Sequence, residues 1–234
     1  MYFLTSQMNT FKIENGEKIA QVMDNRNGLI EQLKLYIKKY ENFVFVANNP
    51  DSHDITKIYA DLMFQSFELS GMKFENYTIL DNLNKEQTKE LIENADVVFL
   101  AGGHVPTQNK FIHEIGLKEL LVDYDGIVIG QSAGSMNMSS RVYNYPSDES
   151  ELNDPKYLQG LDLTDINIIP HFDLECGNPS DGSIDLLRLF KEDSYTTPLY
   201  CIVDGSHVKV NDNSTTFYGE AYLIKDGNIT TINK

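Results

Sequence analysis

The sequence predicts an α/β fold: a three-layer α/β/α sandwich with a mostly parallel central sheet, ending in a β-hairpin. Two observations indicate this. Short, continuously apolar runs alternate with longer segments of helical periodicity, and the final segment places an Asp-Gly pair between two β-rich runs. Continuously apolar strands are typical of parallel sheets that helices cover on both faces. A chain of 234 residues can bury such a core, and we expect residues 1–234 to form one domain.

The expected strands are rich in aromatic and β-branched residues. They lie at 2–5, 43–47, 77–80, 96–100, 126–129, 166–169 and 199–203, with a closing hairpin at 222–232 around Asp226-Gly227. Expected helices cover 28–39, a segment from Asp51 or Ser52 to Gly71, a segment opened by an Asn84–Gln87 capping box, and about 104–122. Residues 143–154 have the composition of a surface loop. The polar stretch 9–27 is expected to cover a pocket or to form an interface, such as that of a homo-oligomer.

The composition is that of a globular protein with an acidic surface. Hydrophobic residues make up 41% of the chain and charged residues 23%. The formal net charge of −16 disfavours nucleic acids and anionic membranes as partners. No signal-peptide pattern is present, and no segment approaches the roughly 20 apolar residues of a membrane helix. Cys176 and Cys201 form neither a disulfide framework nor a C-x-x-C zinc motif. We therefore expect a cytoplasmic protein with no metal and no cofactor.

The segment Gly130-Gln131-Ser132-Ala133-Gly134 matches the G-x-S-x-G pattern of a nucleophile elbow. It follows an apolar strand and precedes an expected helix, which is the context that this turn requires. The glycines leave room for a strained turn that exposes the Ser132 hydroxyl. The free amides and the positive dipole end of the following helix then point at the same place. Ser132 is therefore the candidate nucleophile.

A serine hydroxyl needs a base to remove its proton, and histidine is the usual base near neutral pH. His171 directly follows the strand expected at 166–169, so it lies at the edge of the sheet where Ser132 should emerge. His207 is the alternative, although its alternating neighbours indicate a position within a strand. His53 and His113 belong to expected helices, and His104 lies in the glycine loop.

A third group must accept a hydrogen bond from the other imidazole nitrogen. Asp204 follows the strand expected at 199–203 and precedes a glycine, which suits a carboxylate at a strand end. The same Asp-Gly pair is also typical of an ordinary turn. Asp173 and Glu175 are alternatives, but the chain would have to fold back to bring either one to His171.

The backbone amides of Gly102 and Gly103, together with that of Ala133, are the candidate oxyanion hole. A glycine pair after a strand is also typical of a tight turn. The chain contains neither a Walker A sequence nor a G-x-G-x-x-G sequence, which removes the usual phosphate-binding interpretations.

These motifs, in this order, resemble the dipeptidase E (aspartyl dipeptidase) family, whose members share a class I glutamine-amidotransferase-like fold. The matching pieces are Ala101-Gly102-Gly103, Gly130 to Ser135, Pro170-His171-Phe172 and Val203 to Ser206. The resemblance implies a serine peptidase with Ser132 as nucleophile and His171 as base. Asp204 stands where dipeptidase E has a glutamate. Glutamine amidotransferases carry a cysteine at the elbow, so release of ammonia from glutamine is not expected here.

The resemblance also implies a small peptide substrate, for example Asp-Xaa. In that family, polar residues after the elbow helix recognise the amino-terminal aspartate. Here that segment contains Arg141, which could pair with a substrate carboxylate, and Asp148, which could pair with a free amine. An ordinary charged loop is the alternative interpretation of both residues.

Two further functions are compatible with the sequence. An α/β-hydrolase-type esterase would use Ser132, Asp173 or Asp185, and His207, in the chain order of that fold. A non-catalytic binding module would keep the elbow without turnover.

Overall fold

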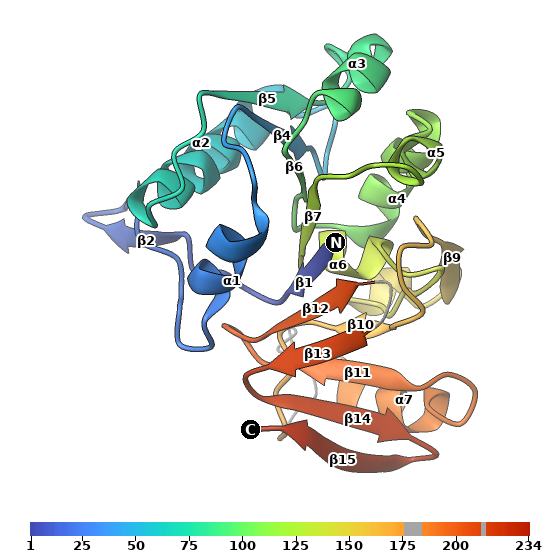
Figure 1. Cartoon of the computed structure of the whole chain (residues 1–234). Coiled ribbons are helices and arrows are strands. Elements are labelled where there is room, and N and C mark those ends of the chain that lie inside the picture. The colour runs from blue at the N-terminus through green and yellow to red at the C-terminus, as the bar shows by residue number, and fades with distance from the viewer. Residues whose placement is uncertain (176–183, 212–213) are drawn as a thin grey trace.

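A seven-stranded sheet forms the centre of the computed structural model (Figure 1). The structure describes residues 1–175, 184–211 and 214–234. The strands of this sheet span Tyr2–Thr5 (β1), Asn42–Val46 (β4), Asn76–Leu80 (β5), Val97–Leu100 (β6), Ile127–Gln131 (β7), His207–Asn211 (β12) and Ser214–Tyr218 (β13). Their order is β13-β12-β1-β7-β6-β4-β5. The five strands β1, β7, β6, β4 and β5 pair with one another in parallel. Strands β12 and β13 are added at one edge in antiparallel orientation. The predicted α/β fold with a mostly parallel central sheet is confirmed.

Helices pack against both faces of this sheet, to the left and right of the strands in Figure 1. They span Leu29–Tyr36 (α1), His53–Leu69 (α2), Thr88–Glu93 (α3), Val105–Glu114 (α4), Leu117–Leu121 (α5) and Ala133–Asn137 (α6). Side chains alternate between the faces along each strand. In β4, Phe43 and Phe45 join the core under α1 and α2, while Val44 and Val46 join the core under α3 to α6. This two-sided burial explains why the strands are continuously apolar.

A second, four-stranded sheet carries the last third of the chain. It contains Ile168–Ile169 (β10), Leu199–Ile202 (β11), Ala221–Lys225 (β14) and Asn228–Asn233 (β15), in that order. Helix α7 (Leu186–Asp193) packs on it through Leu186 and Phe190. The turn between β14 and β15 places Asp226 at φ 51° and Gly227 at φ 74°, as a two-residue hairpin turn requires. The predicted closing hairpin is confirmed.

Two small hairpins lie outside these sheets. Phe11–Glu14 (β2) pairs with Glu17–Ala20 (β3), and the polar stretch 9–27 is thus largely a hairpin. It packs on α2, where the Phe11 and Tyr59 rings lie 6.1 Å apart. Arg141–Tyr143 (β8) pairs with Tyr157–Gln159 (β9). The loop expected at 143–154 lies between those strands and contains a short 3₁₀ helix, Glu149–Glu151 (η2).

Two predicted helix boundaries differ from the structure. Asn84 does not cap a helix, because its side chain accepts from the Asp81 amide and donates to the Ile79 carbonyl. A 3₁₀ turn, Lys85–Gln87 (η1), precedes α3 instead. The single helix expected at about 104–122 is divided into α4 and α5, since Gly116 adopts a left-handed φ of 63° between them.

Helix α2 has the predicted extent, but the helical spacing of its apolar residues does not by itself identify the face that is buried. Ile55 and Tyr59, which recur at helical spacing, are 60% and 41% exposed. The face packed on the sheet carries Ala60, Met63 and Phe67 instead. An apolar stripe on the open side of a surface helix therefore needs another explanation, and the functional site provides one.

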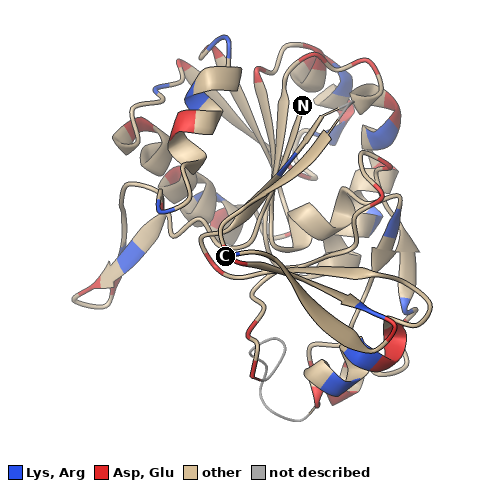
Figure 2. Ribbon diagram, turned by 60° about the horizontal axis from the view of Figure 1, so that its bottom comes forward, with Lys and Arg blue, Asp and Glu red and all other residues tan. Residues whose placement is uncertain are grey.

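Charged residues lie mainly on the outer helices, loops and hairpins, and most of the central strands is free of them (Figure 2). Among the described residues, none of the helices combines the length and the apolar character that crossing a bilayer would demand.

His207 is a fully buried histidine on β12, which confirms its predicted strand position. Its ring stacks on Tyr218 at 4.8 Å with an interplanar angle of 6°. Neither ring nitrogen has a hydrogen-bond partner among the described residues. Burial, helped by nearby Lys209, lowers the pKa of His207 to about 4. The folded protein therefore holds this imidazole in its neutral form at neutral pH.

We predict that His207 makes the fold sensitive to mild acid. Between the unfolded pKa of about 6.5 and the folded pKa of about 4, the unfolded chain binds a proton that the folded chain does not. Stability is therefore lost as pH falls through that window, by about 1.4 kcal/mol per pH unit. In urea unfolding, His207→Phe should reduce the loss of unfolding free energy between pH 7 and pH 5 by about 2 kcal/mol. The exposed His113→Phe change should leave that loss as in the wild type, and an equal effect of both would contradict the prediction.

Candidate active site

The elbow connects β7 to α6 and holds Ser132 in a strained conformation, with φ 51° and ψ −113°. A Cβ on Gly130 would lie 2.6 Å from the Ser135 nitrogen, and one on Gly134 would lie 2.1 Å from the Leu100 carbonyl oxygen. Both glycines are therefore required by close backbone approach, which is the physical content of the G-x-S-x-G pattern. The turn presents the Ser132 hydroxyl beyond the carboxyl end of the parallel strands, where ligands bind in such sheets.

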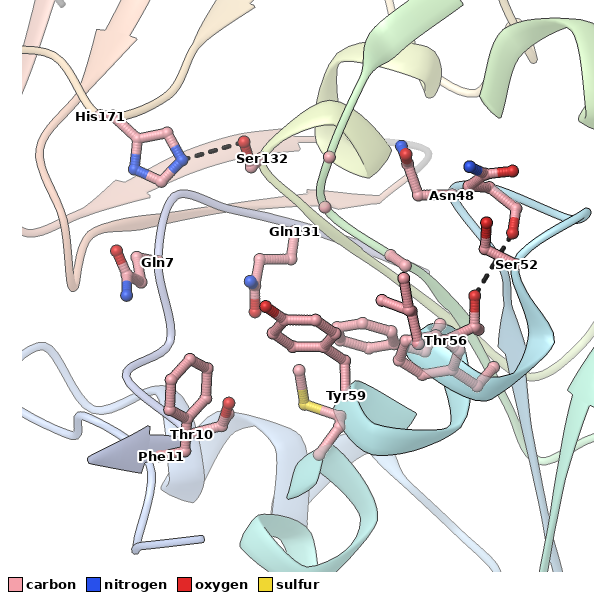
Figure 3. Close-up of a pocket in the computed structure, with 18 residues that line it drawn as sticks. Gln7, Thr10, Phe11, Asn48, Ser52, Thr56, Tyr59, Gln131, Ser132 and His171 are labelled. Atoms are coloured by element: carbon pink, nitrogen blue, oxygen red, sulfur yellow. Dashed lines mark hydrogen bonds between the residues drawn. The ribbon is translucent and has the colours of Figure 1, made fainter. Parts of the chain in front are cut away.

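His171 reaches Ser132 from the second sheet. It follows β10 after one proline and itself adopts a positive φ of 56°. Its Nε2 lies 2.9 Å from Ser132 Oγ (Figure 3), and its Nδ1 lies 2.7 Å from Asp204 Oδ1. Asp204 follows β11, the parallel neighbour of β10, so the two strand ends place the two side chains next to each other. The structure thus brings together the three side chains that the sequence selected.

Asp204 is held as a carboxylate by several donors. Partial burial alone would raise its pKa, but hydrogen bonds from His171, from the Ser6 hydroxyl and from the Gln7 backbone hold the pKa below its usual value. Arg26 adds a hydrogen bond from Nη2 to the Asp204 carbonyl oxygen, at 3.1 Å. An ionised carboxylate at this position favours an imidazolium at His171.

Ser6 is a residue that sequence reasoning missed. Its Oγ donates to Asp204 Oδ1 at 2.6 Å and accepts from the His171 backbone amide at 2.8 Å. Ser6 directly follows β1, which lies beside β7, and the Ser132 amide donates to the carbonyl of neighbouring Thr5. The available signal was positional: a serine after an expected strand, at the same sheet edge as the elbow.

The glycine loop after β6 lies beside the nucleophile. A Cβ on Gly102 would lie 3.4 Å from Ser132 Cβ, and Gly103 needs its φ of 142° and its lack of a side chain to pass Asn48. Asn48 fixes this loop through two hydrogen bonds, accepting from the His104 amide and donating to the His104 carbonyl. Ala133 begins α6, and the first amides of a helix have no partner within it. Gly102 thus lies beside the Ser132 side chain, and Ala133 directly follows it in the chain, so the predicted oxyanion-hole positions flank the elbow.

A cavity of about 560 Å³ opens from Ser132 and His171, within the range of about 300–1,000 Å³ that is typical of ligand pockets. The hairpin residue Phe11 and the α2 residue Tyr59 form its outer wall (Figure 3). The exposed apolar side of α2 thus faces this cavity. Residues 9–27 were expected either to cover a pocket or to form an interface. The structure supports the first alternative, because Thr10 and Phe11 line the cavity.

Other predicted site residues lie elsewhere. Arg141 stacks its guanidinium on the Tyr157 ring at 3.6 Å, and Asp148 accepts from the Ser150 amide at the start of η2. Neither is part of the cavity lining formed by the described residues, so their positions do not support the predicted role in substrate binding. Local sequence could not show this, since the β8–β9 pairing directs the segment away.

The alternative candidates for the base and for the carboxylate make other contacts. The buried His207 ring stacks on Tyr218, and the esterase arrangement that needs it is not assembled. Asp173 accepts from the Glu175 amide and Asp185 caps α7. His104 bonds Thr107 through Nδ1 and pairs with Glu151 through Nε2.

Of the two cysteines, Cys201 is a buried free thiol, and Cys176 lies outside the described residues. Within the part of the chain that the structure describes, no group of three or more acidic, histidine or cysteine side chains could hold a metal ion.

Comparison with known proteins assigns the chain to a family. The model of peptidase family S51 matches residues 20–218, which is most of the chain. The chain belongs to peptidase family S51. Family S51 proteins are serine-type peptidases of the peptidase E type, and membership implies a serine dipeptidase with a peptide substrate.

The solved structures agree at the level of the fold. A Listeria monocytogenes EGD-e protein provisionally assigned as a peptidase E matches with a TM-score of 0.61 and 17% identity, over 92% of this chain and 96% of that one. An Argonaute protein from Methanocaldcoccus janaschii matches with a TM-score of only 0.24 and 10% identity, over 98% of this chain and 50% of that one. That second similarity is too low to carry a structural argument. None of the curated proteins matches the S51 chain in sequence.

We predict that Ser6 positions the histidine–aspartate pair of this S51 protein. Ser6→Ala should lower kcat for dipeptide hydrolysis by about 10- to 100-fold, because a hydrogen bond to a charged group contributes about 1.5–3 kcal/mol. KM should change little, since Ser6 is not among the described residues that line the cavity.

Ser140→Ala is the matched control, because the Ser140 hydroxyl also bonds an aspartate, Asp165, but on the exposed surface. Wild-type kcat in Ser6→Ala, or an equal loss in Ser140→Ala, would contradict the positioning role.

Proposed function

We propose that this chain is a dipeptidase-like serine peptidase that hydrolyses short peptides through a Ser132–His171–Asp204 triad and an acyl-enzyme. One observation carries the proposal. A continuous hydrogen-bond chain runs from Ser132 Oγ through both nitrogens of His171 to Asp204 Oδ1, at 2.9 and 2.7 Å. Nucleophile, base and orienting carboxylate therefore already lie within the distances that acyl transfer requires.

In the proposed first step, His171 Nε2 removes the Ser132 proton while Oγ attacks the scissile carbonyl carbon. Asp204 accepts a hydrogen bond from Nδ1–H and stabilises the imidazolium that forms. The carbonyl oxygen becomes an oxyanion, which the amides of Gly102, Gly103 and Ala133 stabilise. A single donor of this kind typically contributes about 3 kcal/mol to the transition state.

The tetrahedral intermediate then collapses. The carbon–nitrogen bond breaks, His171 gives its proton to the leaving amine, and the acyl group remains on Ser132 as an ester. Water attacks this ester with His171 again as base, and the second collapse returns the proton to Ser132 and releases the carboxylic acid. No redox partner or further reactant is needed.

We propose that residues 1–234 act as one domain with a class I glutamine-amidotransferase-like, three-layer fold. The support is that both sheets contribute to one site, Ser132 from the seven-stranded sheet and His171 and Asp204 from the four-stranded sheet. The cytoplasmic location and a homo-oligomeric state stay predictions from the sequence.

A fluorophosphonate probe tests the mechanism directly, because it forms an adduct only with an activated serine. We expect one adduct, on Ser132 by mass spectrometry, in the wild type. Ser132→Ala should give none, and His171→Ala should lower both labelling and dipeptide hydrolysis by at least about 10⁴-fold. Asp204→Asn should lower kcat by about 10³-fold or more, because the imidazole loses its orienting charge.

His113→Ala is the control for a histidine outside the site, where the ring contacts the Gln159 carbonyl. It should keep wild-type labelling. An unlabelled wild type would favour the non-catalytic binding module, and hydrolysis that survives in Ser132→Ala would contradict the mechanism.

A further inference from the structure

We propose that the cavity beside Ser132 selects peptides whose first residue has a large apolar side chain, such as Phe, Leu or Met, over those that begin with Asp. The inference rests on the proposed function, because it assigns the acyl part of the substrate to this cavity. It concerns the apolar and amide side chains that line the cavity, which the proposed reaction steps do not use.

The walls of the cavity are largely hydrocarbon. Seven apolar side chains are among the described residues that line it: Phe11, Phe45, Ile55, Tyr59, Met63, Phe99 and the small Ala101. Phe45, Met63 and Phe99 are buried and form part of the core, whereas Ile55 and Tyr59 remain substantially exposed. A ligand that covered these last two would remove apolar surface from water, which is the main source of affinity for an apolar group.

The polar part of the lining contains no carboxylate, lysine or arginine among the described residues. It includes amide and hydroxyl side chains such as Gln7, Asn48 and Ser52. Gln131 also lines the cavity, and its Oε1 is buried without a hydrogen-bond partner among the described residues. An aspartate side chain placed here would lose hydration without gaining a countercharge, which is costly.

The position of His171 indicates which part of the peptide enters the cavity. The leaving amine must receive its proton from Nε2, so the leaving residue lies beside the imidazole. Figure 3 shows His171 on one side of Ser132, while Tyr59, Thr56 and Ser52 lie away from the ring. The acyl residue, which is the first residue of a dipeptide, therefore extends toward these α2 side chains.

The β2–β3 hairpin completes the selective wall. Phe11 contacts the edge of Tyr59, and Lys18 Nζ lies 4.0 Å from the Tyr59 ring centroid and 5.2 Å from that of Phe11. Lys18 also donates to the Tyr59 hydroxyl. This cation thus contacts both aromatic rings and is not part of the described lining.

The first test compares dipeptides with a common leaving group: Phe-Ala, Leu-Ala, Met-Ala, Ala-Ala and Asp-Ala. We expect kcat/KM for Phe-Ala to exceed that for Ala-Ala and for Asp-Ala by about 10- to 100-fold, the discrimination that one apolar pocket provides. Equal values, or a preference for Asp-Ala, would overturn the inference.

Variants then assign the preference to the wall. Phe11→Ala and Tyr59→Ala should each lower the Phe-Ala to Ala-Ala ratio by about fivefold or more. Ile13→Ala is the matched control, since Ile13 lies on the same hairpin, is 70% exposed and does not line the cavity. Lys18→Met should leave the Asp-Ala to Ala-Ala ratio of kcat/KM as in the wild type, because the ratio depends on the acidic side chain alone. A selective loss of Asp-Ala activity in Lys18→Met would show that this cation recognises an acidic side chain, and would contradict the inference.

Binding to Ser132→Ala separates this inference from the proposed reaction. Calorimetry on that variant should give a Kd for Phe-Ala at least tenfold below that for Asp-Ala. Tighter Phe-Ala binding together with an unlabelled wild-type serine would overturn the proposed hydrolysis and keep the pocket assignment. A labelled serine together with tighter Asp-Ala binding would keep the hydrolysis and overturn the pocket assignment.

Discussion

The 2.9 Å contact between the Ser132 hydroxyl and the His171 imidazole depends on how two separate sheets meet. Ser132 ends a strand of the seven-stranded sheet, and His171 follows a two-residue strand of the other sheet. Ser6 connects them, because it follows β1 of the first sheet and bonds both His171 and Asp204. Since β1 is hydrogen-bonded to β7, a shift of one sheet relative to the other would move Ser6 and Ser132 together away from the pair.

Two residues of this contact hold unfavourable backbone conformations. Ser132 and His171 have φ values of 51° and 56°, and such conformations typically cost about 1–3 kcal/mol each. Local structure compensates at both places. The Ser132 turn is held by the hydrogen bond from the Ser132 amide to the Thr5 carbonyl and by the helix that starts directly after it. The His171 amide donates a hydrogen bond to the Ser6 hydroxyl. The strain therefore orients the hydroxyl and the ring before any substrate arrives.

The sequence was sufficient for the parts of the site that are local. The elbow, its strand and its glycines form one segment, and the ends of the strands before His171 and Asp204 follow from apolar runs that stop at those residues. The expected strand at 166–169 was too long, since only Ile168–Ile169 pairs in the sheet. Ser6 and the partners of Arg141 could not be predicted, because each depends on which strands become neighbours. The alternating pattern around His207 gave its strand but not its burial beneath Tyr218.

Catalytic and selective parts of the site rest on different kinds of structure. Strand ends, whose spacing is set by backbone hydrogen bonds, hold the three side chains of the proposed triad within hydrogen-bond distance of one another. The cavity wall combines core side chains of the seven-stranded sheet with side chains from α2 and from a hairpin that belongs to neither sheet. Phe11 and Tyr59 line the cavity, and neither lies on the strands that precede the residues of the proposed triad. Ile55 and Tyr59, two exposed apolar residues of α2, face the cavity, and the proposed apolar substrate residue would give them a second surface beside the sheet.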